Sequence, residues 1–485
     1  MTQRDRGGLQ SSAWHIPRFA WCCLLLVLVG CGTPSVAAPA VLHSSEIRAS
    51  STPAMAAIAQ PASVPSPRVA PQPAATATPD MPLPSLNLEA TVALPATPTA
   101  TLEPSPTPNH VLTLEERERI FNEVWQRVND NYLYANFNGI DWKALHDAFA
   151  PQIAAAESNE QFYSIVAAMV AELDDHHSRF GPPAAAVSED AIVSGHEATV
   201  GIGVLAAPTN EGAFIQIVFP NSPAEQAGLR PRDRIITVDG RPYQPADDNL
   251  QGQEGTTVRL TVVSPSEKPR DVVLPRKEVE ERIAPYSRRL AGDIGYVWIS
   301  TLWVNDTDEQ VSGALTELVA AGPLKGIILD LRGNPGGWSH VLSGILSHFV
   351  RGQVGMFFDR NNNVRPLVVP PPAGPDLRAL PLVVLIDQDT ASYAEVLGAV
   401  LQHEAHATVI GVPSAGNTET IYAYTLFDGS RLWLAREGFR LQNGENLEGH
   451  GVQPDETIDV DWKRYSEDDD PQLLEALRVL KAKIK

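Results

Sequence analysis

Residues 382–402 read LVVLIDQDTASYAEVLGAVLQ and decide the fold of the C-terminal half. The apolar run 382–386 is typical of a buried strand, and apolar residues recur at helical spacing after Ala394. Short apolar strands that alternate with helices indicate βαβ units and a largely parallel sheet. This stretch therefore predicts one such unit, with Ser392 where the strand gives way to the helix.

Neighbouring segments repeat this pattern, so we assign residues 279–462 to an α/β core. We expect strands at 295–299, 326–332 and 407–411, helices at 306–321 and 394–402, and a hairpin at 426–433 that turns on Asp-Gly. The C-terminal segment 463–485 carries an amphipathic helix from Pro471.

Two smaller units precede the core, which makes the chain a multidomain α+β protein. Residues 111–185 predict a helical unit, whose first helix follows a capping box formed by Thr113 and Glu116. Two further helices are expected near 142–155 and 159–173.

Residues 197–278 resemble a PDZ domain, a β-barrel-like fold. The resemblance rests on SPAEQAGL at 222–229 and RDRIITVDG at 232–240. It implies that consecutive backbone N–H groups of a glycine-containing loop bind the terminal carboxylate of a peptide. That loop is made of Gly201, Ile202, Gly203 and Val204. A β-rich spacer without peptide binding is the alternative.

The N-terminal residues predict an export signal and a tether. Phe19–Gly30 is a 12-residue apolar or small run, short of the ~20 residues that span a membrane. It ends in Leu-Val-Gly-Cys31, which resembles a bacterial lipoprotein signal over 1–31, with an ordinary signal peptide or short anchor as the alternatives. Residues 32–110 hold 16 of the 41 prolines and no aromatic ring except histidine, which predicts a disordered spacer.

Composition narrows the functions further. The net charge of −21 argues against nucleic acid or an anionic lipid surface as the partner. All three cysteines lie at or before Cys31, which excludes a cysteine nucleophile or thiolate metal site in the folded part. We expect a protein outside the cytoplasm that meets the bacterial membrane only through lipid on Cys31, or else is secreted.

Ser392 could attack a carbonyl carbon, because a helix N-terminus at the end of a strand supplies N–H groups that hold an oxyanion. A serine at a helix start is more often only a cap. A second segment, DLRGNPGG at 330–337, also follows a buried strand, and its glycines could bring backbone N–H groups to the same site.

Together these segments resemble the C-terminal processing peptidases, or tail-specific proteases, a serine peptidase family that includes the tricorn protease core. The resemblance covers nearly the whole chain from about Leu114 and implies that Ser392 is the nucleophile. It also implies an oxyanion hole formed by the N–H of Tyr393 and that of Gly336 or Gly337.

One position departs from the Ser–Lys members of the family. Asn417 stands where they carry the lysine base, and an amide cannot accept the serine proton at neutral pH. The tricorn-like members use a histidine that matches His177, with His176 and His450 as rivals here. Their acid matches Glu448, which would orient the base.

The sequence therefore predicts a serine endopeptidase without cofactor or metal. No H-E-x-x-H or similar metal-binding arrangement occurs. The expected partners are proteins or peptides with free C-terminal tails. The alternative is an inactive PDZ scaffold that only binds peptides.

Overall fold

The computed structural model describes residues 110–175, 177–244 and 250–484. The predicted signal sequence, Cys31, the tether and His176 lie outside the described residues. Within the described part, no helix combines the length and apolar character that crossing a membrane requires.

The N-terminal unit consists of three helices, α2 (Leu114–Asn131), α3 (Trp142–Ala155) and α4 (Asn159–Ala171). The predicted capping box is present at α2, where Thr113 and Glu116 exchange hydrogen bonds. The helices pack through buried apolar side chains, to which β18 (Arg431–Leu441) adds its own. The helical unit and the core therefore share a hydrophobic core.

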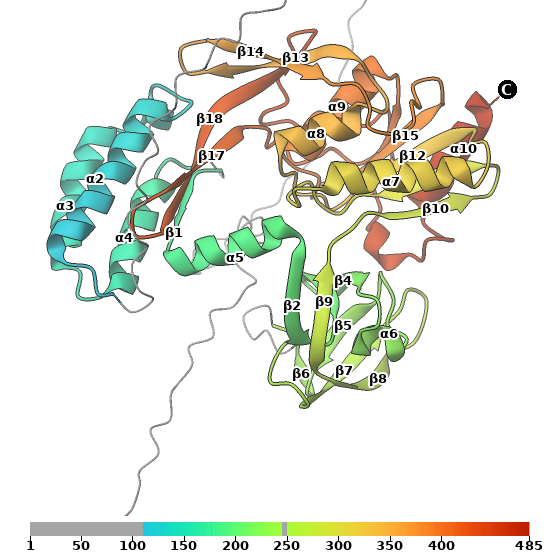
Figure 1. Ribbon diagram of the computed structural model, residues 1–485, viewed down its shortest axis with the longest axis horizontal. Coiled ribbons are helices and arrows are strands. Elements are labelled where there is room, and N and C mark those ends of the chain that lie inside the picture. The colour runs from blue at the N-terminus through green and yellow to red at the C-terminus, as the bar shows by residue number, and fades with distance from the viewer. Residues whose placement is uncertain (1–109, 176, 245–249, 485) are drawn as a thin grey trace, which may run out of the picture. The chain divides into compact units, whose positions relative to one another are not determined.

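An antiparallel sheet continues this connection (Figure 1). Its order is β1-β18-β13-β14, from β1 (Arg179–Gly181), β18, β13 (Gly352–Asp359) and β14 (Val364–Val369), with β17 (Thr420–Thr425) on β18. β1 directly follows the helical unit, and its Arg179 lies opposite Trp433. The segment that carries His177 is thereby fixed to the C-terminal half.

The PDZ region is an open sheet rather than a closed barrel, with β3 and β8 at the two ends of the order β3-β4-β5-β7-β8. Its strands are β3 (Val204–Thr209), β4 (Gly212–Val218), β5 (Arg234–Val238), β6 (Arg241–Pro242), β7 (Thr257–Val263) and β8 (Arg270–Pro275). The short helix α6 (Pro223–Gln226) begins at the Ser222 N-cap, as SPAEQAGL predicts. β2 (His196–Gly201) and β9 (Lys277–Arg282) form a separate pair that joins this region to the core.

The core is a three-layer α/β sandwich. Its sheet has the order β10-β11-β12-β15-β16-β19, parallel except for β10. The strands are β10 (Tyr286–Leu290), β11 (Ile294–Trp298), β12 (Gly326–Asp330), β15 (Leu382–Ile386), β16 (Thr408–Gly411) and β19 (Glu456–Thr457).

Helices cover both faces of this sheet, which explains why β11, β12 and β15 are apolar throughout. α7 (Thr307–Ala320), α8 (Ser339–Leu346) and α9 (Tyr393–Glu404) pack on one face, and α10 (Pro471–Lys483) packs on the other. The predicted fold class is confirmed, including the helix from Pro471.

The PDZ region contacts the core through polar and aromatic side chains. Arg232 donates a hydrogen bond to Asp470 over 3.0 Å, and the rings of Phe214 and Trp462 meet edge-on at 5.4 Å. The Trp462 indole donates to Asp387, which in turn accepts the N–H of Gly333. These contacts lead from the PDZ region to the loop 330–337.

Candidate active site

Ser392 lies in a sharp turn between β15 and α9, as predicted. Its backbone has φ 56° and ψ −129°, a conformation that a residue with a side chain rarely adopts. Its N–H group lies 2.8 Å from the carbonyl oxygen of Asn417 and 2.9 Å from a carboxylate oxygen of Glu395. The turn is therefore held in its strained geometry by hydrogen bonds.

Glu395 is a buried carboxylate that the sequence analysis did not single out. Besides Ser392 N–H, it accepts hydrogen bonds from Ser414 Oγ at 2.6 Å, Gly416 N–H at 2.7 Å and Asn417 N–H at 2.9 Å. Burial raises the pKa of Glu395 although these donors oppose the shift. Glu395 thus connects the Ser392 turn to the loop that carries Asn417. Its place three residues after a helix-capping serine was the one available signal.

The loop 330–337 touches the Ser392 turn through Gly336. A Cβ built on Gly336 would lie 2.6 Å from the Cβ of Ser392 and 2.9 Å from the nitrogen of Tyr393, so this close approach needs glycine. The Gly336 N–H donates to Asn334 Oδ1 at 2.9 Å. In the described part of the chain, neither the Tyr393 N–H nor the Gly337 N–H has a recorded hydrogen-bond partner.

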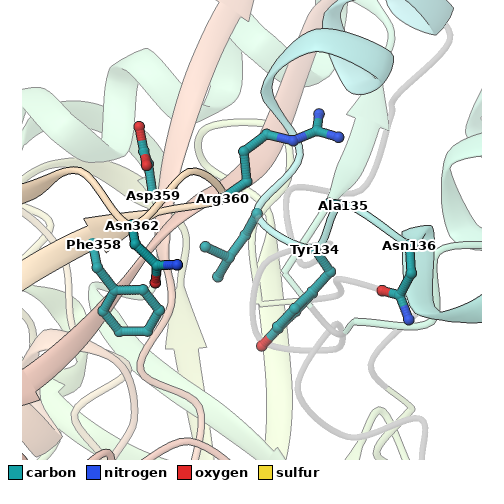
Figure 2. Close-up of a pocket in the computed structure, with 8 residues that line it drawn as sticks. Tyr134, Ala135, Asn136, Phe358, Asp359, Arg360 and Asn362 are labelled. Carbon is teal, nitrogen blue, oxygen red and sulfur yellow. The ribbon is translucent and has the colours of Figure 1, made fainter.

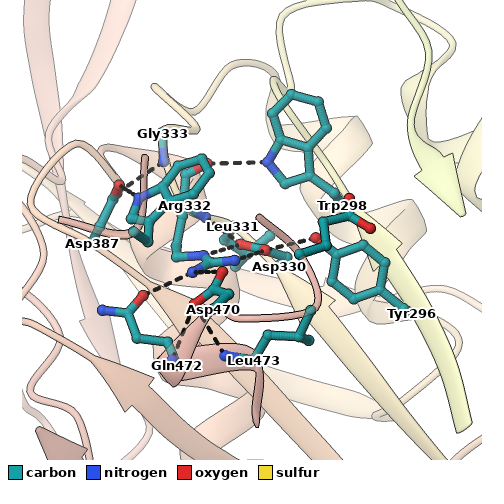
Figure 3. A network of polar contacts seen from close by, with 12 residues as sticks. Tyr296, Trp298, Asp330, Leu331, Arg332, Gly333, Asp387, Asp470, Gln472 and Leu473 are labelled. Atoms are coloured by element: carbon teal, nitrogen blue, oxygen red, sulfur yellow. Dashed lines mark hydrogen bonds and ion pairs between the residues drawn. The ribbon is translucent and has the colours of Figure 1, made fainter. Parts of the chain in front are cut away.

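A buried ion cluster anchors the start of this loop (Figure 3). The fully buried guanidinium of Arg332 donates to both oxygens of Asp330, to Asp470 and to Gln472. The indole of Trp298 donates to the carbonyl oxygen of Arg332. A buried cation is tolerated only when paired and hydrogen-bonded, and here its donors are shared among three side chains. The DLRG segment therefore has a structural role.

His177 follows the helical unit in a tight turn. Its N–H and that of Ser178 donate to Asp175 Oδ1 at 3.0 and 2.7 Å, and Ser178 Oγ accepts the N–H of Ala435 in β18. The imidazole is buried, with 5% of the side chain exposed. Its Nε2 lies 3.5 Å from Glu419 Oε2 and 3.8 Å from Glu448 Oε1.

The charges around His177 shift its proton affinity and that of its neighbours. Burial lowers the pKa of His177, but Glu448 and Glu419 outweigh burial and leave this pKa above its ordinary value. Burial likewise raises the pKa of Glu448, but His177 and the Thr418 donors outweigh it, so this pKa is lowered. The two carboxylates therefore strengthen proton binding by the imidazole, and the imidazole weakens proton binding by Glu448.

Glu419 is the second residue that the sequence analysis missed. Its side chain is 3% exposed, one of its oxygens accepts a hydrogen bond from the Tyr134 hydroxyl, and burial raises the pKa of Glu419 to about 7. No motif signals it, because its neighbours Thr418 and Thr420 are ordinary strand-edge residues. Only the fold brings Glu419 and Glu448 to the same imidazole.

One loop joins the two halves of the site. Asn417 accepts the N–H of Ser392, and the next residue, Thr418, donates its N–H and hydroxyl to Glu448 Oε2 at 2.7 and 3.1 Å. Among the described residues, no hydrogen bond is recorded between the Ser392 hydroxyl and His177. The rival His450 is exposed, and its ring nitrogen Nδ1 lies 3.2 Å from the carbonyl oxygen of Glu448.

An open pocket of about 320 Å³ lies beside this site. Tyr134, Arg360 and Asn362 are among the residues that line it (Figure 2). Tyr134 thus belongs both to this pocket and, through Glu419, to the surroundings of His177.

In the PDZ region, the predicted loop 201–204 packs against the start of α6. A Cβ on Gly203, which has φ 78°, would lie 2.3 Å from the Cβ of Ser222. Ile202 is buried and donates its N–H to Leu250, so this N–H is not free for a carboxylate. β4 pairs with β3 along its length and with β5 only through Ala213 and Phe214, and β3, which begins at the loop 201–204, is an end strand of the sheet.

Comparison with known proteins agrees with this architecture. Residues 293–458 match the model of peptidase family S41, residues 114–171 match the tricorn protease C1 domain, and residues 218–264 match a PDZ domain. The core is a family S41 peptidase domain. The predicted resemblance is thereby confirmed, and the chain is a serine-type peptidase.

Curated proteins that are similar to this chain carry related names. The chain is 27% identical over 368 residues to the carboxyl-terminal-processing protease of Synechocystis sp. This match covers 73% of this chain and 84% of the relative. It is 29% identical over 289 residues to the carboxy-terminal processing protease CtpB of Bacillus subtilis. This match covers 58% of this chain and 59% of the relative. The photosystem II D1 C-terminal processing protease superposes with a TM-score of 0.51 at 25% identity, covering 76% of this chain and 98% of that structure.

Proposed function

We propose that this S41 peptidase cleaves protein or peptide chains through an acyl-enzyme formed on Ser392, with His177 as general base. The observation that carries the proposal is the buried His177 facing two carboxylates, one of which is bound by the residue after Asn417. A proton acceptor is needed because a hydroxyl of ordinary pKa does not attack an amide at useful rates. Asn417 cannot be that acceptor.

The imidazole has two nitrogens with different surroundings. Nε2 faces the carboxylates of Glu419 and Glu448, so Nδ1 is the nitrogen left to accept the Ser392 proton in this arrangement. Glu448, whose other oxygen is fixed by Thr418, would hold the ring and stabilise the imidazolium that forms.

The oxyanion would be held by backbone N–H groups. Tyr393 N–H and Gly337 N–H are the better candidates, because Gly336 N–H already donates to Asn334. Gly336 would then contribute by allowing the loop to approach Ser392.

The PDZ region would select the C-terminal tail of the substrate. The loop 201–204 lies beside the open edge of β3, so a tail added as a strand there would place its carboxylate at the loop. Lipidation of Cys31 would keep the enzyme at the outer face of a bacterial membrane, with residues 32–110 as the spacer.

The test is labelling by a fluorophosphonate probe combined with hydrolysis of labelled casein. The parent protein should be labelled on Ser392, and Ser392→Ala should remove both labelling and hydrolysis while thermal unfolding is unchanged. His177→Ala should lose nearly as much activity as Ser392→Ala, because residues of one catalytic unit are not additive. An unlabelled, folded parent protein that still binds tail peptides would instead support the inactive PDZ scaffold.

A further inference from the structure

Three potential metal ligands converge beside Ser392. The His177 Nε2, Glu419 Oε2 and Glu448 Oε1 atoms all lie within 4.8 Å of one another. Two of them, His177 Nε2 and Glu419 Oε2, are buried and lie 3.5 Å apart as an ion pair, but neither atom forms a hydrogen bond in the described part of the chain. Their side chains are 5% and 3% exposed. Buried polar atoms without a hydrogen bond are costly, so a ligand bound by these atoms would stabilise the site.

The spacing of these atoms fits a small divalent cation. Zinc binds imidazole nitrogen and carboxylate oxygen at about 2.0–2.2 Å, which puts neighbouring ligands of a tetrahedral site roughly 3.3–3.6 Å apart. The distances from His177 Nε2 to Glu419 Oε2 and Glu448 Oε1 are 3.5 and 3.8 Å. Small side-chain movements would therefore complete three corners of a tetrahedron and leave the fourth for water.

Each carboxylate is also oriented by hydrogen bonds to the oxygen that does not face His177. The other oxygen of Glu419 accepts a hydrogen bond from the Tyr134 hydroxyl, and the other oxygen of Glu448 accepts hydrogen bonds from the N–H and the hydroxyl of Thr418. Metal ligands are commonly fixed by such outer hydrogen bonds. Magnesium and calcium prefer sites made of oxygen alone, so the imidazole favours zinc among common divalent cations.

We propose that His177, Glu419 and Glu448 form a reversible zinc site that switches the peptidase off. The inhibitory effect rests on the proposed role of His177 as base. When Nε2 donates its lone pair to zinc, the one proton of the neutral ring lies on Nδ1, and neither nitrogen can accept the proton of Ser392. Both carboxylates bind the ion as anions, so none of the three side chains is free to act as a base for Ser392 while zinc is bound.

Zinc binding is measured first without reference to activity. The Ser392→Ala protein is titrated with zinc in competition with a chromophoric chelator, and we expect one bound ion per chain. Glu419→Gln in the same background should weaken binding at least about tenfold, because even outer-shell changes cost ~10–100-fold. His403→Ala is the matched control: His403 forms an exposed pair with Glu445 at 3.4 Å, and its loss should leave the affinity unchanged.

The second measurement is the effect of zinc on peptidase activity. Micromolar zinc should inhibit casein hydrolysis by the parent protein, a chelator should restore it, and the half-inhibiting concentration should match the directly measured dissociation constant. Thermal unfolding shows whether Glu419→Gln is folded. If Glu419→Gln is unfolded, Glu448→Gln is tested in its place. Absent binding, or binding that Glu419→Gln and Glu448→Gln leave intact, overturns the zinc site. Binding without inhibition keeps the site but shows that His177 is not the base.

Discussion

The contact between Gly336 and Ser392 gives a sharp test of how the site is assembled. In Gly336→Ala, the new Cβ would lie 2.6 Å from Ser392 Cβ, 2.8 Å from the Ala391 carbonyl oxygen and 2.9 Å from Tyr393 nitrogen. Carbon atoms in contact prefer about 3.5–4.0 Å, so the loop and the turn must separate by roughly 1 Å. A displacement of about 1 Å at a reacting group costs about 100-fold, so kcat/KM should fall at least that much.

Backbone strain is a separate effect that a second glycine isolates. Gly336 has φ 85°, where alanine costs about 1–2 kcal/mol of folding free energy. Gly292 has φ 90° and open space around its Cβ position, so Gly292→Ala carries the strain without the clash. Both variants should lose similar stability in thermal unfolding, but only Gly336→Ala should lose casein hydrolysis and fluorophosphonate labelling. If Gly336→Ala keeps more than a tenth of the activity, or Gly292→Ala loses as much, the close-approach argument is refuted.

Further predictions concern the base, the buried acid, the tail and the anchor. The acidic limb of the kcat/KM profile should lie above pH 6.5, because the raised pKa of His177 keeps the ring protonated to higher pH; a limb below pH 6 would contradict this. Glu395→Gln should lower the free energy of unfolding by roughly 1–3 kcal/mol for each N–H or hydroxyl left unpaired, measured by urea unfolding; an unchanged midpoint would refute it. Amidating a substrate's C-terminus should raise KM, whereas equal kinetics would exclude tail recognition. Cys31→Ser should abolish lipid labelling and membrane association, and a variant still bound would exclude this anchor.

The elements set by local pattern could be predicted from the sequence. The strand 382–386 and the helix Trp142–Ala155 have the predicted bounds, because an unbroken apolar run and a helical period each specify one element. α8 and the hairpin of β13 and β14 were missed. β13 contains two glycines and mixes apolar with polar residues, so its pairing with β18 is what makes it a strand.

The residues of the candidate site also fall into those that a local motif predicts and those that only the fold brings together. Ser392, His177 and Glu448 could be named because each lies in a motif that resembles known peptidases. Glu395 and Glu419 could not, because the features that distinguish them, burial and convergent hydrogen bonds, arise only when distant segments meet. Glu419 also places a second carboxylate beside the imidazole, and this contribution to the pKa of His177 could not be predicted from the sequence.

The pairing of β1 with β18 also bears on when the enzyme can first act. Arg179 and Trp433 face each other across this pair but are about 250 positions apart in the chain. At a synthesis rate of ~5–20 residues per second, the ribosome adds the later strand roughly 13–50 s after the earlier one. Until then His177, the proposed base, has no strand to hold it, and Ser392, the proposed nucleophile, has no acceptor for its proton. A nascent chain therefore cannot cut its neighbours before its own C-terminal half is made.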